Sequence, residues 1–408
     1  MRTPRIAPTL LACAALLGGC GVNANDSGSS SSSSSSSASG SNVQSIQVNL
    51  GPTGNYVNGV FTSVTVCTPG STSACSTVDN VLVDTGSYGL RLLASQVSAS
   101  LTAQTSGSGS VGECVLFADN TYTWGPVVTA DVYLGGEVAS SLPINLIGST
   151  GSFTASAPSS CWNGDTAGTP TADDTVATLG ANGILGVGPF GPDCGSYCAE
   201  TANNDYYFSC SGSSCSSVAV ADSSQVQNPV TYFSTDNNGV IVELPSIPAS
   251  GQATADGSLI YGIGTQSNNS LGSALIVYAD SEGEFSTSFN GGSYPDSFID
   301  SGSNGLYFAD SSLAQCSDDE GFYCPSSTQS FSATMTGANG GVADVSFSVA
   351  NLDNLDGSYA AFDDIAGTTG SLISTSFDWG LPFFYGKDIY FAIDGKAVGS
   401  DSGPFYAF

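Results

Sequence analysis

The sequence predicts an all-β protein made of two related lobes, and three observations support this. Short apolar or alternating runs recur along the chain, separated by clusters of Gly, Asn, Ser and Pro that are typical of turns. Long helical periodicity is absent. One pattern, an apolar run followed by Asp-Thr/Ser-Gly-Ser, occurs twice, 216 residues apart. We place the first lobe at residues 43–235 and the second at 236–408.

The start of the chain is expected to lie outside the fold. Residues 1–19 have the basic start and apolar run of a secretory signal, too short to span a membrane. Leu-Gly-Gly-Cys, ending at Cys20, resembles a bacterial lipobox with a lipidated cysteine; the alternative is an ordinary signal peptide cleaved near a cysteine. Because Gly21 rather than Asp follows, the resemblance implies anchoring in the outer membrane. The Ser/Gly-rich residues 20–42 predict a flexible tether.

Strand-like runs begin at Val43 and continue to the C-terminal region. Two segments, 92–101 and 228–236, are instead expected to form short helices. The clearest expected strands are 45–50, 60–66, 129–136, 239–245, 258–264, 342–350 and 388–399.

Cysteine usage indicates an exported, disulfide-bonded protein. The chain has 12 cysteines, and ten remain once Cys13 of the signal and Cys20 are set aside. Spacing and elimination predict five bridges, although the four cysteines between 194 and 215 have alternative pairings. The predicted bridges are Cys67–Cys75, Cys114–Cys161, Cys194–Cys198, Cys210–Cys215 and Cys316–Cys324.

Charge and composition exclude several classes of function. With 35 acidic and five basic residues, the chain lacks the cations that bind nucleic-acid phosphates. It contains no histidine, which excludes a Ser-His-Asp triad, a Cys-His dyad and histidine zinc sites. Acid–base chemistry near or below neutral pH must therefore use carboxyl groups.

The repeated pattern aligns two aspartates, Asp84 and Asp300, each at the end of an apolar run. Downstream of each lies a second shared segment, "NGILGVG" (182–188) and "FDWGLPFF" (377–384), which we expect to be loops packing beside their own aspartate turns. The other aligned pairs are Thr85 with Ser301, Gly86 with Gly302, and Ser87 with Ser303.

Each position in this pattern has a chemical purpose if the two copies meet. Two carboxyl groups about 3 Å apart cannot both ionise, so they share one proton and act together as acid and base. The Thr and Ser hydroxyls can bond across to the other copy, and glycine lets backbone N–H groups approach the carboxyls. A single Asp-Thr-Gly would more simply cap a turn; two copies in matching contexts favour a catalytic pair.

These segments resemble the pepsin-like aspartic peptidases. "VLVDTGSYGL" (81–90) and "SFIDSGSNGL" (297–306) are similar to their active-site loops, and "FYGKDIYFAIDGKAVG" (384–399) to their closing strand and turn. Within that class the chain resembles an uncharacterised family of secreted bacterial lipoproteins. The resemblance implies a bilobal β fold, a cleft for an extended peptide, Asp84 and Asp300 as catalytic residues, and neither metal nor cofactor.

Two departures from the family concern the first lobe. The hairpin that covers the cleft in the family has a tyrosine near its tip, where this chain has Ala118; Tyr122 fills that role only if the hairpin is rebuilt. The tryptophan that partners this tyrosine is replaced by Arg91. Three readings of Arg91 stay open: a salt bridge to a nearby acid, a charge that lowers the pKa of the aspartate pair, and a ligand for a substrate carboxylate.

Further candidates accompany the second lobe and the aromatic residues. Asp378 replaces an apolar residue, and is either exposed by a shifted loop or a third carboxyl near the site. Trp124 and Tyr307 are candidates for the cleft, with core packing as the ordinary alternative for the three tryptophans, including Trp162 and Trp379. Two acidic runs, 318–320 and 363–364, are candidates for calcium or for solvated loops.

The sequence therefore predicts an acid-acting aspartic endopeptidase, tethered to the bacterial envelope. We expect a monomer that takes an extended polypeptide and touches membrane only through its lipid. The alternative is a binding protein of the same fold without turnover, such as a receptor; a stalk or adhesin would leave the repeat unexplained.

Overall fold

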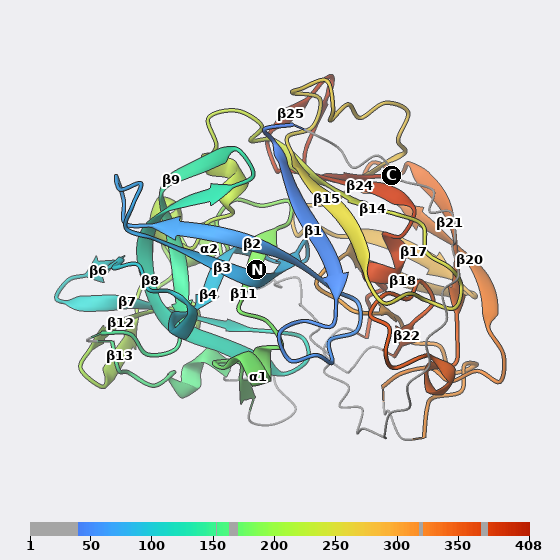
Figure 1. Cartoon of the computed structure of the whole chain (residues 1–408), viewed down its shortest axis with the longest axis horizontal. Helices are drawn as coiled ribbons and strands as arrows, with labels where there is room; N and C mark the ends of the chain where they lie inside the picture. Colours follow the sequence, from blue (N-terminus) through green and yellow to red (C-terminus); the bar gives the residue numbers. More distant parts are fainter. Residues whose placement is uncertain (1–39, 152, 163–169, 318–320, 369–373) are drawn as a thin grey trace, which may run out of the picture.

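The computed structural model in Figure 1 describes residues 40–151, 153–162, 170–317, 321–368 and 374–408. The predicted all-β class is confirmed, because 46% of the chain is strand and only 8% is helical. The expected signal peptide, Cys20, the tether up to residue 39 and the acidic run 318–320 lie outside the described residues. Within the described ranges, none of the helices combines the length and apolar character needed to cross a membrane.

Strands follow one another closely along the chain, and every strand expected from the sequence is present. Those of the first half are β1 (Val43–Asn49), β2 (Gly59–Cys67), β3 (Cys75–Asp84), β4 (Tyr88–Leu93), β5 (Thr102–Ala103), β6 (Thr105–Ser106), β7 (Gly109–Leu116), β8 (Thr121–Leu134), β9 (Glu137–Ile147), β10 (Thr171–Ala172), β11 (Gly183–Val187), β12 (Tyr207–Ser211) and β13 (Ser214–Ser217). Those of the second half are β14 (Gly239–Leu244), β15 (Ala255–Tyr261), β16 (Ile276–Tyr278), β17 (Phe285–Phe289), β18 (Gly292–Ile299), β19 (Leu306–Tyr307), β20 (Gln329–Thr336), β21 (Val342–Val349), β22 (Ala366–Gly367), β23 (Asp378–Trp379), β24 (Lys387–Ala392), β25 (Ala397–Val398), β26 (Asp401–Ser402) and β27 (Phe405–Ala407).

In the described ranges, helices are few and short: α1 (Val176–Leu179), α2 (Ser196–Glu200) and single 3₁₀ turns. The two helices expected from the sequence were wrong in extent. Leu92 and Leu93 belong to β4, which pairs with β9, so only residues 94–96 form a 3₁₀ turn. The second segment has one 3₁₀ turn, Pro229–Tyr232, which Asn228 caps through its side chain. The expected tether also ends earlier than predicted, because Asn42 is buried and donates to the carbonyl of Tyr261.

Among the described residues, hydrogen bonds join 18 strands into one sheet system and seven strands, β17 to β23, into a second. The two halves of the chain lie on opposite sides of Figure 1, with β1, β14 and β15 between them. β1 pairs with β15 over six residues, from Val43 with Ile260 to Val48 with Ala255. The first strand of the described residues is therefore bound to a strand beyond the expected lobe boundary at residue 235.

The same three-strand unit holds both aspartate turns. β11 runs parallel to β3 and antiparallel to β4, on either side of the Asp84 turn. β23 runs parallel to β18 and antiparallel to β19, on either side of the Asp300 turn. The segments expected to pack beside the two turns do so, although each contributes a strand rather than a loop.

An aromatic core supports the second turn from behind. Phe377 stacks on Trp379 with ring centroids 4.1 Å apart, and on Phe308 at 4.5 Å. The indole of Trp379 is fully buried and donates to the hydroxyl of Thr287. Trp379 is therefore a core residue, which was the ordinary alternative for it, and its burial fixes β23, the strand that also contains Asp378.

All five predicted disulfides are present, joining the pairs that spacing and elimination gave. Several bridges in one chain indicate an extracytoplasmic protein, because reducing compartments keep thiols free. The Cys114–Cys161 bridge spans 47 residues, whereas the others span eight or fewer.

Replacing Cys114 and Cys161 together by alanine should lower the free energy of unfolding by about 4 kcal/mol, because this bridge restricts the unfolded chain most. The same change at Cys67 and Cys75 should cost about 2.5 kcal/mol, because that loop is shorter. Urea titrations followed by tryptophan fluorescence would measure both. A larger loss for the short loop than for the long one would contradict the entropic account.

Candidate active site

The two aspartates predicted to meet do meet. Asp84 is the last residue of β3, Asp300 directly follows β18, and both side chains are fully buried. The backbone N–H of Gly86 lies 2.9 Å from Oδ1 of Asp84 and 3.0 Å from Oδ1 of Asp300. One backbone donor thus serves both carboxyls, and a hydrogen bond also joins the two side chains. The pair can therefore share a proton.

The predicted cross-bonding of the hydroxyls is also present. The backbone N–H of Ser301 donates to Oγ1 of Thr85 at 2.8 Å, and the N–H of Thr85 donates to Oγ of Ser301 at 3.2 Å. The Ser301 hydroxyl then donates to the carbonyl of Val83 at 2.7 Å, which crosses from one turn to the other. These bonds lie within a fully buried setting, so they hold the two turns in a fixed mutual position.

Glycine is required next to each aspartate. A Cβ atom on Gly86 would lie 2.5 Å from Cγ of Asp300, and one on Gly302 would lie 2.7 Å from Oδ1 of Asp84. Both distances are shorter than any ordinary contact between these atoms. Each glycine therefore permits the carboxyl of the opposite copy to approach.

Asp378 is the third carboxyl of the site, which settles the alternatives left by the sequence. It is fully buried, and its Oδ2 lies 2.6 Å from Oγ of Ser303, which lies 2.9 Å from Oδ2 of Asp300. A serine hydroxyl carries one hydrogen, so it cannot donate to two carboxylates at once. One carboxyl must therefore be protonated and donate to Ser303. On the first copy, Ser87 donates to Oδ2 of Asp84 and has no such third acid among its described contacts.

Burial dominates the electrostatics of the site. It raises the pKa of Asp300 well above the usual range, and the negative charges of Asp84 and Asp378 raise it further. Burial likewise raises the pKa of Asp378 and outweighs the opposing effect of its hydrogen bond with Ser303. Both groups therefore keep a proton at a pH where an exposed aspartate has lost it. Because Asp300 can share its proton with Asp84, we assign Asp378 as the carboxyl that donates to Ser303.

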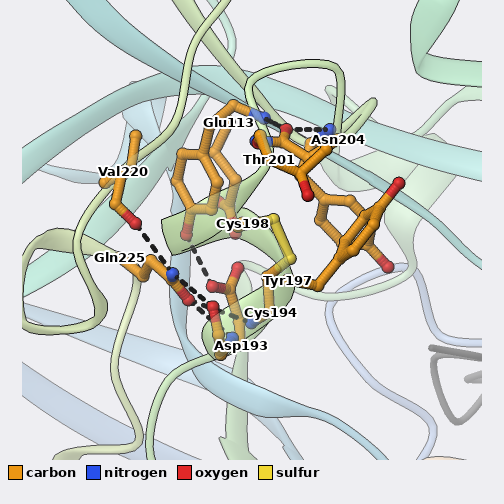
Figure 2. The surroundings of a disulfide bond; sticks show 12 residues. Glu113, Asp193, Cys194, Tyr197, Cys198, Thr201, Asn204, Val220 and Gln225 are labelled. Carbon is orange, nitrogen blue, oxygen red and sulfur yellow. Dashed lines mark hydrogen bonds between the residues drawn. A yellow bond between two sulfur atoms is a disulfide. The ribbon is translucent and has the colours of Figure 1, made fainter. Parts of the chain in front are cut away.

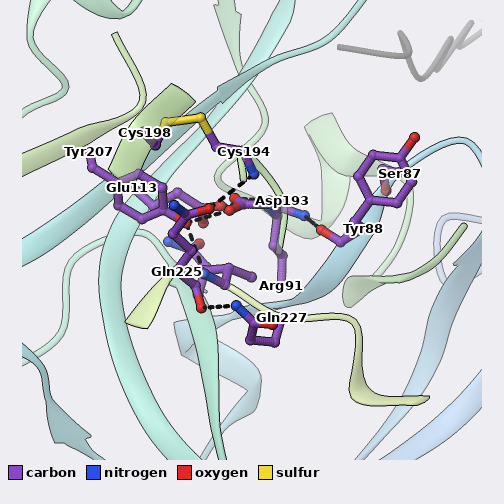
Figure 3. Close-up of polar contacts among 12 residues, drawn as sticks. Ser87, Tyr88, Arg91, Glu113, Asp193, Cys194, Cys198, Tyr207, Gln225 and Gln227 are labelled. Atoms are coloured by element: carbon purple, nitrogen blue, oxygen red, sulfur yellow. Dashed lines mark hydrogen bonds and ion pairs between the residues drawn. A yellow bond between two sulfur atoms is a disulfide. The ribbon is translucent and has the colours of Figure 1, made fainter. Parts of the chain in front are cut away.

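Arg91 does not belong to the aspartate pair. Its guanidinium is buried and contacts Glu113 at 2.6 Å and Asp193 at 2.9 Å, while also donating to the carbonyl of Tyr88 (Figure 3). Burial alone would lower the pKa of Arg91, but the charges of Glu113 and Asp193 raise it overall. The salt-bridge reading of Arg91 is therefore the one that holds.

The aromatic candidates of the first half lie in a separate cluster around the Cys114–Cys161 bridge. Tyr122 packs against Trp162, with ring centroids 4.9 Å apart, and Trp124 donates from its buried indole to the carbonyl of Ala155. Trp124 is a core residue, so its candidacy for the cleft was wrong. Tyr122 lies near the tip of the β7–β8 hairpin, whose turn is residues 117–120, but its ring contact is with Trp162.

Tyr307 is almost completely buried and pairs in register with Asp378. Its hydroxyl donates to the side chain of Asn304, so it supports the second turn rather than lining an open cleft. Within the described residues, the single group of three potential metal ligands contains Cys316 and Cys324, which form a disulfide. The acidic pair 363–364 is not part of it.

Sequence reasoning missed Tyr88, Glu113 and Asp193. Tyr88 was present in the repeat but was not singled out, although its counterpart in the second copy is Asn304. That difference between otherwise matching copies was the available signal. Glu113 and Asp193 carry no local signal, because they reach Arg91 only through the pairing of distant strands.

A protein-family model described as "Protein of unknown function (DUF3443)" matches residues 38–408. This match covers most of the chain, which therefore belongs to that family. No curated protein matches the sequence.

Replacing Arg91 by Met should destabilise the fold by about 3–5 kcal/mol at neutral pH, because two buried carboxylates lose their cation. Burial raises the pKa of Asp193 most, and the charge of Glu113 raises it further. The folded protein therefore holds a proton on Asp193 more tightly than the unfolded chain does. Acidification should therefore return part of the lost stability. Urea titrations at about pH 4 and pH 7 would measure the difference.

The matched control is the triple variant Arg91→Met, Glu113→Gln, Asp193→Asn, which removes the charges together. It should recover most of the stability at neutral pH. A loss in Arg91→Met that grows on acidification would contradict this account.

Proposed function

We propose that this member of the family is an aspartic endopeptidase with a pepsin-like, two-lobed fold. The observation that supports it best is the meeting of Asp84 and Asp300, carried by two copies of one turn and joined by the shared N–H of Gly86. Crossed hydroxyls, obligatory glycines and serine donors surround the pair in both copies. A turn that merely capped a strand would need none of this doubling.

The proposed reaction follows from the different settings of the two carboxyls. Asp84 takes a proton from a water molecule while the water oxygen bonds to the peptide carbonyl carbon, and Asp300 gives its proton to the carbonyl oxygen. The tetrahedral intermediate then collapses: the C–N bond breaks, the amine takes the proton from Asp84, and a hydroxyl of the intermediate returns a proton to Asp300. The raised pKa of Asp300 suits it to the role of acid.

The proposed setting is the cell envelope, with residues 43–235 and 236–408 as the two lobes and Cys20 as the lipid anchor, most simply in the outer membrane. An extended polypeptide would lie between the lobes and hydrolysis would proceed at acidic pH. The acidic surface suits such conditions, because protonated carboxyls leave few like charges to repel one another.

A second candidate function is a binding protein of this fold without turnover. The observation in its favour is that Asp84 and Asp300 are fully buried, so a peptide reaches them only after the site opens. Arg91, which the sequence offered as further support, does not favour it, because its charge is neutralised by Glu113 and Asp193.

Wild-type protein should cleave an unfolded protein substrate at about pH 3–5, and Asp84→Asn or Asp300→Asn should reduce kcat by a factor of about a thousand or more. A statine-type inhibitor should block the wild type. Cleavage would be followed by mass spectrometry of the fragments.

Thr85→Ser is the matched control, because it keeps the hydroxyl that accepts from Ser301 while changing the same turn. It should keep most of the activity. Cleavage that survives Asp84→Asn would refute the catalytic assignment, and an inert wild type that still binds unfolded protein would favour the second candidate.

Asp378→Asn should move the alkaline limit of kcat/KM to lower pH by roughly one unit. When Asp378 ionises, its charge favours the proton on Asp300, so removing the charge lets Asp300 lose its proton earlier. The full pH profile of peptide hydrolysis would measure the shift, with Ser303→Ala tested in the same way because it breaks the connection.

The control for this variant is Asp364→Asn. Burial raises the pKa of Asp364 to about 6, but this carboxyl is not among the groups that perturb Asp300. The pH profile of kcat/KM for Asp364→Asn should match that of the wild type. An alkaline limit that rises or stays fixed in Asp378→Asn would show that Asp378 has only a packing role.

A further inference from the structure

A cavity of about 840 Å³ reaches the turn that carries Asp84, through Tyr88 in its wall, although neither aspartate lines it. It is lined from both halves of the chain: by Tyr88 and residues 190–197 from the first, and by residues 281–282 and 393–396 from the second. A cavity made by both halves, with its wall in the Asp84 turn, is where part of a bound polypeptide would lie.

Tyr88 connects this cavity to the aspartates. Tyr88 follows Asp84 by four residues. Burial is the main cause that raises the pKa of its phenol, and the charges of Asp84 and Asp300 raise that pKa further. Its ring meets Phe190 edge-on, with centroids 5.1 Å apart, and both rings line the cavity. Tyr88 is 8% exposed, so most of its surface packs against the protein. A largely buried aromatic ring in a cavity wall offers a firm apolar surface to a ligand.

The remaining wall is strongly acidic. The carboxylates of Glu200, Asp222, Glu282 and Asp394 line it, and Lys396 is the single cation among the lining residues. Asp193 also lines it but is already paired with Arg91. The whole chain adds to this field, with a net charge of −30 at pH 7.

The acidic wall has a rigid support (Figure 2). The Cys194–Cys198 bridge holds α2 against the preceding loop, and the side chain of Gln225 accepts from the N–H of Gly195 at 2.7 Å. Gln225 also donates to the carbonyl of Val220 at 2.9 Å. The cavity is therefore held open by its own framework rather than by exposed side chains alone.

We infer that this cavity is a specificity site that receives a Lys or Arg side chain of the substrate, one to three residues from the bond that is cut. The aromatic wall of Tyr88 and Phe190 packs on the aliphatic stem, and the carboxylates pair with the cationic head. This inference rests on the proposed peptidase function and narrows its substrates to basic polypeptides.

The test uses peptides that differ at one position, Lys against norleucine, scanned over three residues on each side of the cleavage site. At about pH 5, the upper end of the proposed range, exposed carboxyls are ionised, and wild-type protein should favour Lys by about tenfold in kcat/KM at one position. In the double variant Glu282→Gln, Asp394→Asn this ratio should fall towards one. Neither of these two side chains makes a hydrogen bond among the described contacts, so the fold should tolerate the change.

The matched control is Asp256→Asn with Asp344→Asn, which removes two exposed carboxylates away from the cavity and should keep the tenfold preference. Active protein that shows no preference for Lys at any position, or a preference that persists in the double variant, would overturn the inference and leave the peptidase proposal standing. If the wild type cleaves nothing, calorimetry with the same peptides decides: tighter binding of Lys peptides supports the cavity assignment, and equal binding refutes it.

Discussion

The structure depends on bringing two buried carboxyl groups together, an arrangement that is unfavourable by itself. Two carboxylates in a buried site repel each other, and each loses its hydration. The crossed bonds between Thr85 and Ser301 and the N–H of Gly86 offset this cost by holding donors against the acids. A retained proton removes the remaining repulsion. Geometry and protonation are therefore linked: the turns can meet only if the carboxyls share their charge.

The features that could be predicted from the sequence are those specified by a short, local pattern. Strand runs, close cysteine pairs and the repeated turn are local patterns, and the strands, the bridges and the meeting of Asp84 with Asp300 followed from them. The pairing of β1 with β15 and the partners of Arg91 join distant segments, and no short pattern specifies them. The expected helix at residues 92–101 failed for the same reason, because a neighbouring strand decided the conformation of Leu92 and Leu93.

The two copies of the turn have diverged where they face different surroundings. In the first, Arg91 occupies the position that Tyr307 has in the second, and each satisfies its own buried partners. The supporting strands show the same asymmetry. When Gly186 of β11 is aligned with Gly380, which follows β23, Ile184 stands where Asp378 stands. The repeat therefore preserves the two aspartates with their hydroxyl and glycine neighbours, while the residues behind them differ.

This asymmetry bears on which carboxyl holds the proton. In a perfectly symmetric pair, the two protonation states would have equal energy, and neither aspartate would be marked as acid or base. Asp378 removes that equivalence, because its hydrogen bonds run through Ser303 to Asp300, whereas the matching strand position in the first copy is the apolar Ile184. Any negative charge on Asp378 raises the pKa of Asp300, and a proton on Asp378 can pass to Asp300 through Ser303. The third carboxyl thus favours one of two otherwise equivalent states, the one in which Asp300 holds the proton.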